Sequence, residues 1–130
     1  MMTSFIKTIA ALGLIAHGLI HLMGTIVYMK LGEIPGFNYK TTLLNGRWDL
    51  GVNGMRSFGA LWIFPAVGFM VIGIALLMNL SWWRSILVPV TLFSLIITDV
   101  DWSVAYAGMI VNIAILSLVW WSPLTTGWLG

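Results

Sequence analysis

Long uncharged stretches of apolar residues alternate with short polar segments along the chain. Residues 8–29, 57–83 and 102–130 form uncharged stretches of 22, 27 and 29 residues, and about 20 apolar residues are enough for a helix to cross a membrane. A fourth stretch, between Arg84 and Asp99, has only 14 residues. It can span if the Arg84 side chain extends to the membrane interface at one end and the carboxylate of Asp99 lies at or inside the interface at the other.

The pattern therefore predicts an all-α, polytopic membrane protein, in which residues 1–130 form a single transmembrane domain built as a four-helix bundle. The predicted helices cover residues 5–29, 57–79, 82–100 and 103–122, and residues 30–56 form one long loop between the first two helices. Aromatic residues support four crossings because they form two belts, as expected at membrane interfaces. These belts are Trp82, Trp83, Trp120, Trp121 and Trp128 on the side of both termini, and Tyr28, Trp102 and Tyr106 on the loop side.

The composition narrows the class of protein further. Hydrophobic residues make up 60% of the chain and charged residues only 8%, whereas soluble domains carry about 25% charged residues. The net charge of +2 is scattered rather than clustered, which argues against a nucleic-acid partner. The absence of cysteine excludes disulfides and thiolate metal sites. The lipid bilayer is thus the expected environment of the chain.

The loop at residues 30–56 is too short for a domain and too aromatic for a plain linker. Loops of this length inside compact bundles are usually functional or disordered. Phe37, Tyr39 and Trp48 favour an ordered cap over the mouth of the bundle, and a disordered segment is the alternative.

One face of the first helix carries small and polar residues, at a spacing of three to four residues. Small residues allow close helix approach in lipid, so this face is predicted to be buried and the opposite aliphatic face to contact lipid. The residues of the predicted buried face are Ala10, Gly13, His17, His21, Gly24 and Tyr28.

Polar residues of the other helices lie at matching depth. From the helical rise of 1.5 Å per residue, His21, Ser94 and Asn112 all lie roughly 12 Å below the loop-side surface. Thr98 and Asp101 share the side of Ser94, and Arg56 lies near the same surface. The sequence therefore predicts a polar cleft that opens toward the loop.

Three chemical interpretations of this cleft remain open. His17 and His21, four residues apart on a helix, are spaced to bind one Zn, Fe or Mn ion, with Asp99, Asp101 or Glu33 completing the site. Alternatively, His21 is an acid or base, with His17 and Asp101 as its orienting partners. The cleft then binds a small amphipathic ligand through Arg56, Asn112, Ser94 and Thr98.

The third interpretation is structural, with the histidines serving as packing contacts between helices. Gly59, Ala66 and Gly73 recur every seven residues and form a seam of small residues suited to close helix contact. In this alternative, the protein is a non-catalytic accessory subunit or a homo-oligomer that assembles through this seam.

Residues 16–24, AHGLIHLMG, resemble a family of small bacterial four-helix integral membrane proteins whose first helix carries an HGxxHLxG motif. Val104 and Tyr106 stand where similar sequences carry an Asp and a Lys, and the loop is longer here. Further matches follow in order, namely RxxGxxW at Arg56, Gly59 and Trp62, then Trp82-Trp83-Arg84, then WSx4Gx3N at Trp102, Ser103, Gly108 and Asn112.

The resemblance implies four crossings and singles out His17, His21, Arg56 and Asn112, but it names no reaction. It also implies a multi-pass protein of the bacterial inner membrane with both termini in the cytoplasm, because similar proteins carry basic residues on that face. The basic residues of this chain favour the opposite orientation by a small margin. They are Lys7 and Arg84 on the terminal face, and Lys30, Lys40, Arg47 and Arg56 on the loop face.

Overall fold

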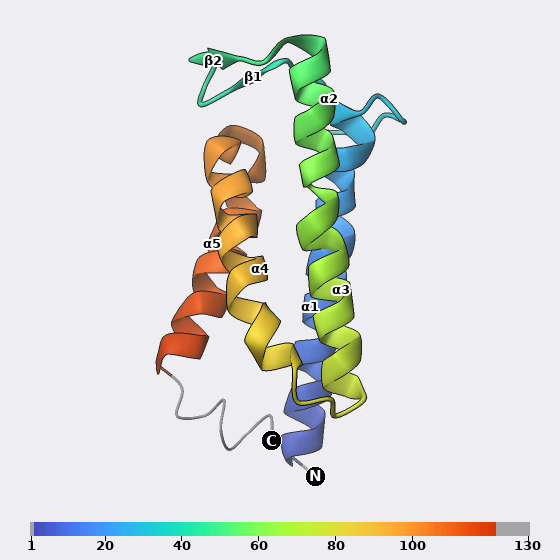
Figure 1. Ribbon diagram of the computed structural model, residues 1–130, viewed down its shortest axis with the longest axis vertical. Helices are drawn as coiled ribbons and strands as arrows, with labels where there is room; N and C mark the ends of the chain where they lie inside the picture. The colour runs from blue at the N-terminus through green and yellow to red at the C-terminus, as the bar shows by residue number, and fades with distance from the viewer. Residues whose placement is uncertain (1, 122–130) are drawn as a thin grey trace.

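The computed structural model describes residues 2–121 and confirms four helical spans (Figure 1). Each of the four is long and apolar enough to cross a membrane, so the chain has the architecture of a multi-pass membrane protein. The helices are α1 (Met2–Tyr28), α2 (Gly51–Leu61), α3 (Ile63–Leu77), α4 (Trp83–Val100) and α5 (Trp102–Trp121), of which α2 and α3 together form the second span.

The second span starts earlier than predicted and contains a break. It begins at Gly51 rather than at residue 57, so the loop between the first two spans ends at residue 50. Trp62 separates α2 from α3, because Pro65 has no N–H to donate to the carbonyl of Leu61 four residues earlier. The other predicted helices agree with the structure to within a few residues, and residue 122, the predicted end of the last helix, lies outside the described residues.

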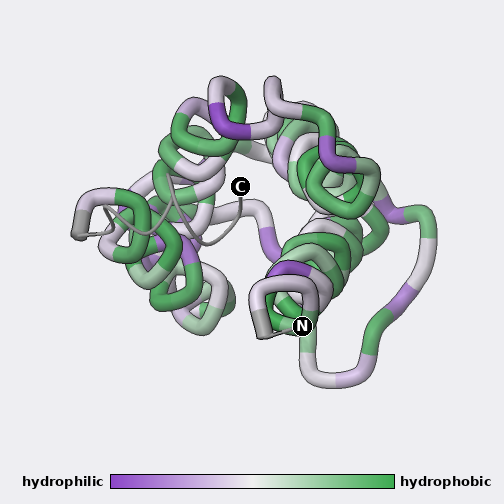
Figure 2. The backbone as a smooth tube through the Cα atoms, turned by 90° about the horizontal axis from the view of Figure 1, so that it is seen from below, coloured by the Kyte–Doolittle hydropathy of each residue, from purple (hydrophilic) through white to green (hydrophobic). Residues whose placement is uncertain are grey.

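The helices pack in sequence around the bundle. α1 lies along α3, α4 packs on α3, and α5 packs chiefly on α4. Seen from below, α1 and α5 stand on opposite sides of the open end of this arrangement (Figure 2). α5 also leans away from α1 toward its carboxyl end (Figure 1). The interface between α1 and α5 is therefore the loosest in the bundle.

The predicted seam of small residues is a packed contact, but its partner is α1 of the same chain. A Cβ atom added at Gly73 would lie 2.7 Å from the backbone carbonyl oxygen of Ala11, and one added at Gly59 would lie 2.9 Å from the Cβ atom of Tyr28. Ala66, fully buried, faces Gly18 in the same way. The prediction of a homo-oligomer built on this seam is therefore wrong, because α1 already covers it.

The long loop is an ordered cap that includes a small β-hairpin, so the chain is not entirely helical. The strands β1 (Thr42–Leu43) and β2 (Trp48–Asp49) are antiparallel. The side chain of Leu43 is buried, and the backbone N–H of Leu44 donates to the carbonyl of Val100 at 2.9 Å. Phe37 is also buried, whereas Trp48 is 52% exposed. The ordered cap is confirmed, although Trp48 does not contribute to its core.

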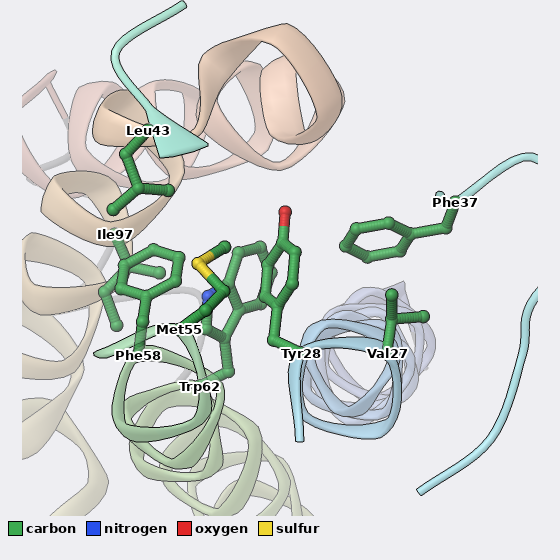
Figure 3. Close-up of a cluster of buried hydrophobic side chains, with 8 residues drawn as sticks. All are labelled: Val27, Tyr28, Phe37, Leu43, Met55, Phe58, Trp62 and Ile97. Carbon is green, nitrogen blue, oxygen red and sulfur yellow. The ribbon is translucent and has the colours of Figure 1, made fainter. Parts of the chain in front are cut away.

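Two apolar clusters form the interior. The loop-side core joins α1, the loop, α2 and α4, and it consists of Val27, Tyr28, Phe37, Leu43, Met55, Phe58, Trp62 and Ile97 (Figure 3). The terminal-side core lies nearer the chain termini and consists of Ala11, Phe69, Ile72, Ala75, Leu76, Trp83 and Leu87.

Three residues differ from a predicted position. Tyr28 and Trp83 are buried in the two cores rather than placed in interfacial belts, because each fills space between helices. The burial of Tyr28 agrees with its predicted place on the buried face of the first helix. Gly13 was predicted on the buried face of α1, but it is exposed, with no atom near the position of a Cβ. The buried face of α1 thus begins at Ala11 and continues through the histidines.

Candidate functional site

A network of buried polar side chains joins three helices in the middle of the bundle. Nε2 of His17 in α1 lies 3.0 Å from Oδ1 of Asn112 in α5. The Asn112 amide nitrogen donates to Oγ of Ser94 in α4 at 2.8 Å and to Oγ1 of Thr98 at 3.3 Å. Ser94 Oγ in turn lies 2.8 Å from Nε2 of His21. The predicted convergence of these residues at one depth is therefore confirmed.

Helical spacing explains how the network forms. His17 and His21 are four residues apart on α1, and Ser94 and Thr98 are four residues apart on α4, so each pair lies on one face of its helix. All four side chains and Asn112 are buried. Since unpaired polar groups are costly in a bilayer, interhelical hydrogen bonds of this kind fix which faces meet.

Aromatic rings surround the two imidazoles. The ring of His21 stacks on Phe69, with centroids 5.8 Å apart, and meets the ring of His17 edge to face at 4.7 Å. Trp62 lies 5.4 Å from His21, measured between ring centroids. The histidines therefore have one polar side, toward Ser94 and Asn112, and otherwise contact aromatic rings.

A cavity of about 190 Å³ adjoins the network between α1 and α5. Pro35, Gly36 and Phe37 of the loop form part of its wall, and Trp62 and Thr98 line it from α2–α3 and α4. The remaining lining residues are His17, Ile20, His21 and Met23 of α1, and Val104, Ala105, Ala107 and Gly108 of α5.

Two buried nitrogen atoms beside this cavity have no hydrogen-bond partner in the part of the chain that the structure describes. They are Nδ1 of His21 and Nε1 of Trp62. The two side chains are only 2% and 4% exposed. Buried polar atoms without a partner are uncommon in native proteins, so this wall of the cavity is the first place to look for a ligand.

Asp101 belongs to a different group of side chains, at the junction of α4 and α5. Tyr28 donates a hydrogen bond to Oδ2 of Asp101, and Nζ of Lys40 lies 2.5 Å from its Oδ1. Burial raises the pKa of the Asp101 carboxyl above its ordinary value, and the Lys40 ammonium and the Tyr28 hydroxyl oppose that rise. The carboxylate therefore fastens the loop to α1 and the helix junction.

The structure corrects the predicted roles of the acidic residues and of Arg56. Asp101 bonds to Lys40 and Tyr28 rather than to either histidine, so it does not orient an imidazole. Asp99 and Glu33 are exposed. Arg56 is also exposed, because it lies on the outer face of α2 next to the buried Met55. It does not line the cavity.

The predicted metal ligands are not assembled into one site. Within residues 2–121, no three His, Asp or Glu side chains are close enough together to hold a metal ion. The Nε2 atoms of both histidines are already paired with Asn112 and Ser94. The donor set needed for Zn, Fe or Mn is therefore not brought together around His17 and His21.

Sequence reasoning assigned no role at the site to four residues that shape these two groups. Phe69 and Trp62 surround the histidines, and Tyr28 and Lys40 hold Asp101. Trp62 could have been found from its position in the RxxGxxW stretch, six residues after Arg56. The pairing of Lys40 could not be predicted from the sequence, because Lys40 lies in an irregular loop 61 positions before Asp101.

Comparisons with known proteins do not identify a relative, since no protein-family model, curated protein or solved structure matches this chain. The function must therefore be argued from the buried network, the cavity and the two unpaired nitrogen atoms.

Proposed function

We propose that this protein is an integral membrane protein that binds a small amphipathic molecule in the cavity between α1 and α5. The observation that carries the proposal is the pair of unpartnered buried nitrogens, on His21 and Trp62, beside a cavity within the spans. Ligand sites are typically apolar concavities with a few polar groups. Ionisable residues inside a membrane are uncommon and usually serve a function.

The geometry supports a molecular ligand better than a metal ion. The paired Nε2 atoms hold both imidazole rings in place, and the cavity offers room beside them. His21 remains our candidate acid or base for any reaction of the bound molecule, because its free Nδ1 atom is beside the cavity. His17 orients it through the network, and Asp101 takes no part.

The proposal is tested by filling the cavity from the lipid side. Ala107 is exposed on α5 and lines the cavity, whereas Ala114, two turns further along α5, is exposed but does not line it. Each protein is purified, extracted with organic solvent and analysed by mass spectrometry. A compound that accompanies the wild type and Ala114→Phe in near-stoichiometric amount, but not Ala107→Phe, supports the proposal. The same extract from all three proteins contradicts it.

The second candidate function is a non-catalytic membrane subunit in which the histidines only join helices. The observation that favours it is the pairing of each Nε2 atom with a neutral side chain of another helix. The double substitution His17→Gln and His21→Gln distinguishes the two. A folded protein that has lost its ligand supports binding, whereas a bundle that no longer folds supports a packing role.

We further propose that the protein lies in the inner membrane of a bacterium, with both termini in the cytoplasm. Four spans put the start of α1 and the end of α5 on one side (Figure 1), and the family resemblance favours the cytoplasm for that side. Fusing alkaline phosphatase, which is active only outside the cytoplasm, to residue 121 tests the orientation. An inactive fusion agrees with the proposal and an active one contradicts it.

A further inference from the structure

The hydrogen bonds of the buried network have a defined direction. The Thr98 hydroxyl donates its proton to the carbonyl of Ser94 at 2.9 Å, so its oxygen can only accept from Asn112. The Asn112 side chain must therefore present its amide nitrogen to Thr98 and Ser94, and its oxygen to His17. If the amide were turned the other way, its oxygen would face the Thr98 oxygen. An amide oxygen only accepts hydrogen bonds, and Thr98 would have no proton left to donate to it.

This direction fixes the protonated nitrogen of His21. Ser94 Oγ accepts from Asn112, and among its contacts in the described residues only Nε2 of His21, 2.8 Å away, can accept the Ser94 proton. A neutral imidazole carries one N–H, so in His21 that N–H is at Nδ1. The indole nitrogen of Trp62 can only donate. Both unpartnered atoms are thus N–H donors.

Both unpartnered buried atoms on this wall of the cavity therefore lack an acceptor. In Figure 3 the indole nitrogen of Trp62 lies on the side of the ring turned away from Tyr28, and Trp62 and Thr98 both line the cavity. Buried N–H groups are normally paired, so an occupant of this cavity is selected by an oxygen that accepts hydrogen bonds.

Volume and charge limit the occupant further. A cavity of about 150 Å³ accepts benzene, so about 190 Å³ accepts one substituted six-membered ring. The described residues that line the cavity include no Asp, Glu, Lys or Arg, which favours an uncharged head group. Ile20 is 58% exposed and Ala107 is also exposed, and both line the cavity. An attached tail can therefore leave between α1 and α5 into the bilayer.

We infer that the ligand is a neutral, lipid-soluble carbonyl compound with a ring-sized head, of which a quinone is the simplest example, held by the N–H groups of His21 and Trp62. This inference rests on the proposed function and specifies the chemistry of the same site.

The test compares two probes of nearly equal shape. Duroquinone and durene are the same tetramethylated ring with and without two carbonyl groups. Each is titrated into ¹⁵N-labelled protein in lipid nanodiscs while the indole N–H signal of Trp62, assigned with Trp62→Phe, and the imidazole nitrogens of His21 are followed. Duroquinone is expected to bind about tenfold more tightly than durene and to shift both N–H signals. In the protein without a probe, the His21 proton is expected on Nδ1.

The matched variants Ala107→Phe and Ala114→Phe show whether binding occurs in this cavity. We expect Ala107→Phe to abolish binding of both probes and Ala114→Phe to preserve it. Should Ala107→Phe fail to fold, Ile20→Phe fills the cavity from α1 instead. Equal affinity for the two probes, or a His21 proton on Nε2, overturns the carbonyl inference but leaves the proposed function standing. Wild-type protein that binds neither probe more tightly than the filled variant overturns both.

Discussion

The two halves of the bundle are stabilised in different ways. The terminal-side core is wholly apolar, and its helices approach closely through glycine and alanine, as at Gly73 and Ala11. The loop-side half combines aromatic rings with buried polar groups. Those groups occur from the middle of the bundle to the loop and are His17, His21, Thr25, Thr91, Ser94, Thr98, Asp101 and Asn112.

The difference shows where this small bundle can accommodate a site. In lipid, close packing of small residues and interhelical hydrogen bonds both hold helices together. The loop-side half differs in having a cavity lined by buried polar residues and two unpaired N–H groups beside it. We therefore expect steric substitutions along the seam to be damaging in both halves, and polar substitutions to matter most in the loop-side half.

The largest effect is expected from Gly73→Leu. The added side chain would meet the Ala11 carbonyl oxygen at 2.7 Å and Ile15 at 2.6 Å, and a backbone atom cannot move aside as a flexible side chain can. We expect a loss of about 3 kcal/mol in the free energy of unfolding, measured by circular dichroism during denaturation in sodium dodecyl sulfate. Gly13→Leu, where no atom lies within 4 Å of the new Cβ, is the control. Equal losses in both variants would contradict the close contact.

The next effect is expected from Lys40→Met in the loop-side half, which leaves the buried Asp101 carboxylate without its cation. Breaking a largely buried ion pair is costly, although the partial exposure of Lys40 and protonation of Asp101 reduce the loss. We expect a loss of about 2 kcal/mol at about pH 8. Arg47→Met, at an exposed position of the same loop, should change the stability little.

The pH dependence of this loss is a second test of the Asp101 group. The pKa of the folded carboxyl is raised above its ordinary value of 3.8, so its contribution to stability is highest below that value and falls as pH rises toward the raised pKa. Without Lys40 the pKa rises further. The loss in the free energy of unfolding caused by Lys40→Met is therefore expected to be small at about pH 4 and to grow toward about pH 8. A deficit that is largest in acid would contradict this account.

A smaller effect is expected from Asn112→Leu, which removes the centre of the polar network. His17, Ser94 and Thr98 would each lose a hydrogen bond, at about 0.6 kcal/mol per bond in membrane bundles. We therefore expect a loss of about 1.8 kcal/mol, measured in the same denaturation assay. The control is Ser117→Ala, since Ser117 bonds only to its own helix at Ile113. No difference between the two variants would mean that the network does not hold α5.

The smallest effect is expected from removing metal ions. The predicted ligands are not gathered in the described residues, so a chelator should leave the thermal unfolding midpoint unchanged. Elemental mass spectrometry of the purified protein and of the double variant His17→Ala/His21→Ala checks this expectation. A near-stoichiometric transition metal that is lost in the variant would contradict it and restore the metal interpretation.

The regular parts of the structure could be predicted because helices have a fixed rise and period. Counting residues from the loop-side surface placed His21, Ser94 and Asn112 at one depth, and the network confirms it. The predicted start of the second helix was wrong for a related reason. Hydropathy marks where a helix becomes apolar, whereas α2 is already helical from Gly51, six residues before the predicted start.

The irregular parts could not be predicted in the same way. Lys40 reaches Asp101 because the hairpin folds back over the junction of α4 and α5, and no periodic pattern encodes that path. Trp62 lies at the break between α2 and α3 and lines the cavity, and hydropathy marks neither feature. The aromatic content of the loop indicated an ordered cap, but it did not indicate which helices the cap would contact.

The contacts of the hairpin also set the order in which the protein can be made. Leu44 bonds to Val100, and Lys40 pairs with Asp101 and bonds to Ser103. Each of these partners leaves the ribosome more than 50 residues after the loop residue that it contacts. Earlier segments emerge first during synthesis. The loop is therefore solvated and lacks these contacts until the third span and the start of the fourth have been made. The cap can therefore close only after residues 100–103 have emerged, and a chain interrupted before them would carry an open loop.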